Sequence, residues 1–123
     1  FVYVRPQEKK HGLTNKIEGD IKPGQTVLVI EDLISTGKSS LQVVDTLREE
    51  GCEVKGMVAI FTYGLDVAIN AFSEKNVPLL TITDYDTLVE TATEQGYIKE
   101  EDLESLALWR KNPEQWSEER MNG

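Results

Sequence analysis

The sequence has one cysteine, few aromatic residues, no long hydrophobic run and a deficit of positive charge. Cys52 alone excludes an internal disulfide, which is typical of a reducing compartment, so we expect a cytoplasmic protein in which this thiol is structural. No apolar run approaches the ~20 residues of a membrane span. The 22 acidic and 13 basic residues give a formal net charge of −9. This charge argues against nucleic acid and anionic membranes as partners.

Strand and helix patterns alternate along the 123 residues, which suffice for one domain with a core. The apolar runs predict strands over 1–4, 26–30, 54–62 and 78–82. Amphipathic patterns predict helices over 38–50, 65–74 and 85–94, the last of these capped by Asp84 or Thr83. This alternation predicts an α/β fold, a Rossmann-like three-layer parallel sheet with flanking helices. Because Phe1 lies inside an apolar stretch, we expect the single domain 1–123 to be incomplete at its N-terminal side.

Two segments fall outside this alternation. Residues 5–24, which we call the arm, are polar and lack strand or helix periodicity. The arm is longer than the ~12–15 residues usual for a structureless loop, so we expect a mobile lid. Residues 97–123 are expected to form C-terminal helices packed by Trp109 and Trp116, with Pro113 starting a final turn.

The segment between the second predicted strand and its helix carries most of the chemistry. It reads Glu31-Asp32-Leu33-Ile34-Ser35-Thr36-Gly37-Lys38-Ser39, and we call it the acidic turn (residues 31–39). Its two carboxylates follow a buried strand, at the end where open α/β sheets bind ligands. They can accept hydrogen bonds from a sugar diol, while the helix N-terminus after them favours a phosphate. The pattern predicts a pocket for a phosphorylated ribose.

Other interpretations of the acidic turn are weaker. Gly37-Lys38-Ser39 suggests a P-loop, but that motif needs a glycine where this chain has Asp32, and a carboxylate there would oppose a triphosphate. No Gly-x-Gly-x-x-Gly dinucleotide fingerprint is present. A purely structural alternative stays open, in which Ser35 or Thr36 caps the helix and the acids are solvated.

The apolar run and the acidic turn together resemble the phosphoribosyl-pyrophosphate (PRPP) signature of the type I phosphoribosyltransferases. The resemblance implies that Glu31 and Asp32 hold the ribose 2′ and 3′ hydroxyls, directly or through Mg²⁺. It also implies that the rest of the turn cradles the 5′-phosphate through backbone amides and hydroxyls. The remaining PRPP-binding positions of the motif are Leu33, Ile34, Ser35, Thr36, Gly37, Lys38 and Ser39.

The arm resembles that of the orotate phosphoribosyltransferases, through Arg5, Lys9, His11 and Gly12 in the pattern Arg-x-x-x-Lys-x-His-Gly. The similarity extends over the whole chain, as roughly the C-terminal 60% of the bacterial enzyme. It implies transfer of the phosphoribosyl group from PRPP to orotate, giving orotidine 5′-monophosphate and pyrophosphate in pyrimidine biosynthesis. Arg5, Lys9 and His11 would bind PRPP and act catalytically on the departing pyrophosphate.

The same resemblance implies a homodimer in which the arm reaches the neighbouring subunit, and Ser35 as the local contact to orotate. Two positions depart from the family pattern: Pro6 replaces a second basic residue, and the segment 63–66 lacks an arginine. The alternatives are a purine-salvage member of the same superfamily, a non-catalytic PRPP-binding regulator, and an inactive α/β interaction domain.

Overall fold

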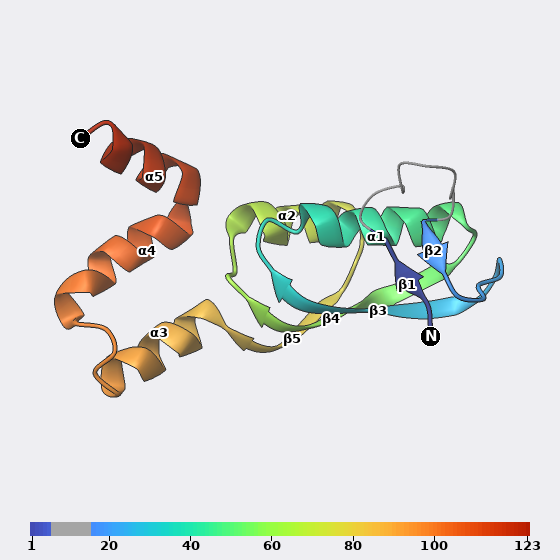
Figure 1. Cartoon of the computed structure of the whole chain (residues 1–123), viewed down its shortest axis with the longest axis horizontal. Helices are drawn as coiled ribbons and strands as arrows, with labels where there is room; N and C mark the ends of the chain where they lie inside the picture. The colour runs from blue at the N-terminus through green and yellow to red at the C-terminus, as the bar shows by residue number, and fades with distance from the viewer. Residues whose placement is uncertain (6–15) are drawn as a thin grey trace.

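The computed structural model describes residues 1–5 and 16–123. Its centre is a parallel three-stranded sheet in the order β3-β4-β5. The strands are β3 (Thr26–Ile34), β4 (Glu53–Thr62) and β5 (Leu79–Asp84). They are connected by α1 (Lys38–Glu49) and α2 (Asp66–Glu74), which lie on the same side of the sheet (Figure 1). The predicted parallel βαβ units are confirmed.

The hydrophobic core lies between the sheet and these two helices. Leu41, Val44 and Leu47 form the buried stripe of α1, as the sequence pattern predicts. They pack in one cluster with side chains of β3 and β4, among which Met57 is 1% exposed. Cys52 belongs to the same cluster and is buried and free, which confirms its structural role.

The opposite face of the sheet is apolar and open. Successive side chains of a strand point to opposite faces, so half of each strand turns away from α1 and α2. The aliphatic side chains exposed there are between 55% and 76% accessible: Leu28, Ile30, Ile60, Leu80 and Ile82. Parallel sheets are normally covered on both faces. The described residues therefore provide a helical layer for one face only.

A small antiparallel sheet lies beside the central one. It pairs β1 (Tyr3–Val4) with β2 (Ile17–Glu18), and an Arg5–Glu18 ion pair connects the two chain segments. The strand predicted over 1–4 is shorter than expected. β2 was not predicted at all, because two residues are too few to show a periodic pattern. It lies within the arm, whose residues 6–15, including Lys9 and His11, are outside the described residues.

Three α-helices follow the sheet and lie away from it (Figure 1). They are α3 (Tyr85–Glu94), α4 (Leu103–Lys111) and α5 (Pro113–Met121), with the short 3₁₀ turn η1 (Glu100–Asp102) before α4. The Asp84 carboxylate accepts a hydrogen bond from the Thr87 N–H at 2.9 Å, which confirms the predicted cap of α3. The chain after Pro113 forms a helix rather than a single turn, because the Asn112 side chain caps it.

Aromatic side chains hold these helices to the end of the sheet. The Trp109 ring lies 5.2 Å from that of Tyr63 and 5.4 Å from that of Tyr85, measured between centroids. Trp116 donates its indole N–H to the Ser105 hydroxyl at 3.2 Å, joining α5 to α4. The predicted packing role of both tryptophans is confirmed. Tyr63 belongs to the same aromatic cluster, since its ring also lies 5.2 Å from that of Phe61.

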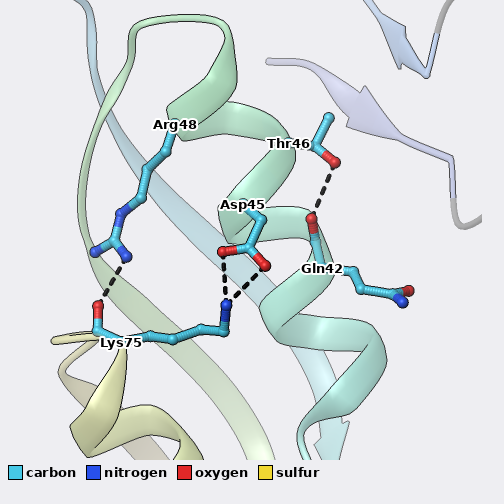
Figure 2. A network of polar contacts seen from close by, with 5 residues as sticks. All are labelled: Gln42, Asp45, Thr46, Arg48 and Lys75. Atoms are coloured by element: carbon cyan, nitrogen blue, oxygen red, sulfur yellow. Dashed lines mark hydrogen bonds and ion pairs between the residues drawn. The ribbon is translucent and has the colours of Figure 1, made fainter.

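A polar network joins α1 to the end of α2 (Figure 2). The Arg48 guanidinium donates to the Lys75 carbonyl at 2.7 Å, and so occupies one of the acceptors that the end of α2 leaves without a helical partner. The Lys75 ammonium returns to α1 and contacts both carboxylate oxygens of Asp45 at 2.8 and 2.9 Å. The network fixes the two helices against each other on one face of the sheet.

Candidate functional site

The two acids of the acidic turn lie inside β3 and not after it. The predicted strand end at Ile30 is wrong, because pairing with β4 continues through Glu31, opposite Ala59, as far as Ile34, opposite Thr62. Carboxylate residues have low strand propensity, but the neighbouring strand supplies hydrogen-bond partners that outweigh it. The ligand-binding end of this strand is therefore four residues further along than the sequence indicates.

Continuation of the strand separates the two carboxylates. Adjacent strand residues point to opposite faces, so Glu31 lies on the side of α1 and Asp32 on the open side. The Glu31 carboxylate accepts the Ser40 hydroxyl of α1 at 2.9 Å and the Asp32 N–H at 3.2 Å. Asp32 is exposed, and its Oδ1 accepts the Leu33 N–H at 2.7 Å. One acid is thus held by the helix, and the other is free to reach a ligand.

Gly37 occupies the N-cap position of α1, and no side chain caps the helix. Thr36 Oγ1 comes only within 3.4 Å of the Lys38 nitrogen, which is long for a hydrogen bond. Gly37, and not Ser35 or Thr36, therefore takes the N-cap position of α1. A helix N-terminus without a side-chain cap keeps its N–H groups available for an anion.

The remaining motif residues divide between core and surface. Ile34 is fully buried and its carbonyl accepts the Tyr63 N–H at 3.1 Å, which fixes the end of β3 against the end of β4. Leu33 is 41% exposed. The side chains exposed around the N-terminus of α1 are Ser35, Thr36, Lys38 and Ser39. Hydroxyl and ammonium groups therefore surround the uncapped end of the helix.

Basic side chains reach the same region from the small sheet. A groove of about 280 Å³ is lined by Arg5, Lys16 and Ser39, together with residues of α1. A larger groove, about 590 Å³, separates β1 from β3 and extends to Glu31 and Ser39. Ser39, the last residue of the acidic turn, lines both grooves. Arg5 lines the smaller groove together with Ser39, while Lys9 and His11 lie outside the described residues.

Among the described residues, no group of three or more histidine, cysteine or carboxylate side chains could hold a metal ion. Glu31 and Asp32 provide two carboxylates at most. Mg²⁺ is commonly bound by one or two carboxylates together with substrate phosphates. The donor set fits a cation that arrives with a phosphorylated ligand, and not a cation caged by protein side chains.

The fold, a parallel sheet whose acidic strand leads into a helix N-terminus at Gly37, is that of the type I phosphoribosyltransferases. A crystal structure of the Mycobacterium tuberculosis orotate phosphoribosyltransferase in complex with PRPP supports the class. It is 30% identical with a TM-score of 0.53, and the match covers 58% of this chain and 42% of that one.

Sequence relatives are closer still. The orotate phosphoribosyltransferase of Phocaeicola vulgatus is 57% identical over 116 residues, which is 94% of this chain and 55% of that protein. The enzyme of the same name from Bacillus caldolyticus is 57% identical over 114 residues, 93% of this chain and again 55% of the relative. No family model matches the chain. The chain belongs to the orotate phosphoribosyltransferase family, and it spans about half the length of the curated relatives it matches.

Proposed function

We propose that the intact protein transfers the 5-phosphoribosyl group of PRPP to orotate, giving orotidine 5′-monophosphate and pyrophosphate in pyrimidine biosynthesis. The observation that carries the proposal is the acidic turn at the end of β3, with an exposed carboxylate on one side and an uncapped helix N-terminus on the other. Relatives that are 57% identical to this chain bear the name of this activity.

In this proposal the sugar phosphate lies over the acidic turn. The α1 N-terminus binds the 5′-phosphate through backbone N–H groups, with hydroxyls from Ser35, Thr36 and Ser39 around it. Both acids accept hydrogen bonds from the ribose hydroxyls, Glu31 from the side of α1 and Asp32 from the open side of β3. Carboxylates near a ribose that gains positive charge at its reacting carbon stabilise that charge, so their placement contributes to the rate.

The pyrophosphate leaving group is bound by residues of the arm. Lys9 and His11, with Arg5, neutralise the departing pyrophosphate, since ammonium and guanidinium groups bind phosphate oxygens strongly. Closure of the arm excludes water, which would otherwise hydrolyse PRPP. We include in the proposal a homodimer in which each arm serves the neighbouring site, and a cytoplasmic location. No helix in the described part of the chain has the length and apolar character needed to cross a membrane.

In this proposal Mg²⁺ binds together with PRPP. The carboxylates of Asp32 and Glu31 would hold Mg²⁺ together with oxygens of the substrate. When bound, the cation neutralises charge on the pyrophosphate. Orotate meets Ser35 at the mouth of the turn. We assign the rest of the base pocket, and the cover of the open sheet face, to parts of the intact protein beyond this chain.

The test is the PRPP-dependent loss of orotate absorbance catalysed by the intact protein. We expect Asp32→Asn and Lys9→Ala each to lower kcat/KM by at least tenfold, because each removes one charge from the site. Lys55→Ala and Asp102→Asn make matching charge changes at exposed positions that the proposal does not use. Those two controls should retain the unmodified rate. Rates unchanged in both site variants would overturn the site assignment, and absence of turnover by the unmodified protein would overturn the activity.

A further inference from the structure

Ser40 is a buried polar residue of the core, just beyond the last residue of the acidic turn. It is 3% exposed, in the first turn of α1, and its hydroxyl donates to Glu31 Oε2 at 2.9 Å. A helical serine often turns its hydroxyl back to the carbonyl four residues earlier. Here the hydroxyl crosses to the neighbouring strand instead, and the two partners are nine residues apart in sequence.

We propose that Ser40 is a positioning residue, which fixes the Glu31 carboxylate for the ribose hydroxyls. The proposal rests on the proposed function, since it assigns a role within the same site. Glu31 accepts from two donors on two different elements, namely the Asp32 N–H of β3 and the Ser40 hydroxyl of α1. Donors at both oxygens fix the plane of the carboxylate, and the lone pairs that remain can accept a hydroxyl.

Among the residues that the structure describes, no second element supports the Asp32 carboxylate. Its one hydrogen bond comes from the next residue of its own backbone, the Leu33 N–H, and its side chain is exposed. The site thus combines an acid held by two elements with an acid held only by its own strand. A pre-oriented group loses less conformational freedom when the ligand binds, so its support contributes to affinity.

The role predicts a specific pattern of PRPP binding by the intact protein, measured by calorimetry with Mg²⁺ present. Ser40→Ala leaves the Glu31 oxygen without its donor, and we expect about a tenfold loss of PRPP affinity, the size of one hydrogen bond to a charged group. Ser40→Cys keeps the buried volume but offers a weak donor, so it should lose affinity to a similar degree while folding normally. Ser73→Ala, which removes an exposed helical hydroxyl from α2, is the matched control.

Double variants separate positioning from a general effect on folding. In a Glu31→Gln background the charged acceptor is gone, so Ser40→Ala should have less than a twofold further effect. In an Asp32→Asn background the full tenfold loss should persist. Urea unfolding of each variant shows the folded fraction at the assay temperature.

The outcomes separate the role of Ser40 from the proposed function. PRPP affinity of Ser40→Ala equal to that of Ser73→Ala would overturn the role of Ser40 and leave the proposed function standing. An equal tenfold loss in the Glu31→Gln background would also overturn it, because Ser40 would then act through the fold. An unmodified protein that does not bind PRPP would overturn the proposed function, and with it the role built on that function.

Discussion

Replacement of Gly37 by alanine tests the geometry of the acidic turn directly. Gly37 caps α1 with φ = +82°, a left-handed conformation that costs a residue with a Cβ about 1–2 kcal/mol. A Cβ built there would lie 2.8 Å from Cε2 of Phe72, a ring that is 4% exposed in the core. Forcing an extra methyl group into a packed core costs about 1–3 kcal/mol. We therefore expect Gly37→Ala to lower the free energy of unfolding by about 2–5 kcal/mol.

Gly24 provides a matched control for the backbone cost. Its φ is +87°, but no atom lies within 4 Å of the Cβ position. Gly24→Ala should therefore lose only the conformational part, about 1–2 kcal/mol. The effect of alanine on the unfolded chain is common to both variants and cancels in their difference. The remaining difference, about 1–3 kcal/mol, measures the contact with Phe72.

The assay is urea unfolding of the intact protein, with the m-value checked for constancy. Adding Phe72→Leu to Gly37→Ala should recover part of the contact cost, since the ring edge that meets the Cβ is removed. Equal destabilisation by Gly37→Ala and Gly24→Ala would refute the reasoning. It would mean that the cap of α1 is not packed against α2, and that the uncapped N-terminus is less rigidly placed than the proposed phosphate site requires.

Two further predictions concern the supports of the fold. Arg48→Ala should lower the free energy of unfolding by about 0.5–1.5 kcal/mol, because it removes the donor from the Lys75 carbonyl at the end of α2 (Figure 2). Asp45→Asn, which touches only the exposed ion pair of the same network, should cost less than about 1 kcal/mol, and the reverse order in urea unfolding would contradict this ranking. The backbone and hydroxyl of Thr87 lower the pKa of Asp84 below its ordinary value. The cap of α3 therefore contributes stability that is present above the ordinary aspartate pKa and lost as the pH falls below it. Asp84→Ala should flatten that part of the acid unfolding curve, and an unchanged curve would exclude the cap as its source.

The sequence predicts the parts of this fold that depend on repeated local patterns. The stripe Leu41, Val44 and Leu47 identifies α1, and the apolar runs within 26–30 and 54–62 identify β3 and β4. Asp84 is predicted as a cap because its short carboxylate and the following helical pattern are adjacent in sequence. In each case the determining contacts are made within a few residues, so the chain itself contains the signal.

The predictions that failed concern structure that depends on a partner far away in the sequence. β3 continues through Glu31 to Ile34 because β4 pairs with it, a contact made by residues about 28 positions later. β2 exists only as a partner of β1, and two residues carry no period. The open apolar face is equally hidden in the sequence, since Ile30 and Ile82 have the same composition signal as buried strand residues.

The same distinction applies within the candidate site. Because Glu31 and Asp32 are adjacent in one motif, the sequence suggests that both carboxylates bind the ribose hydroxyls from the same side. The strand geometry places them on opposite faces, so one acid must be oriented by a neighbour while the other meets the ligand from the open side. That neighbour, Ser40, lies one residue beyond the motif, because its position is set by the first turn of α1 packing over β3. The acidic turn, which is defined by residues expected to contact the ligand, ends at Ser39. It therefore does not include Ser40, the residue that orients Glu31.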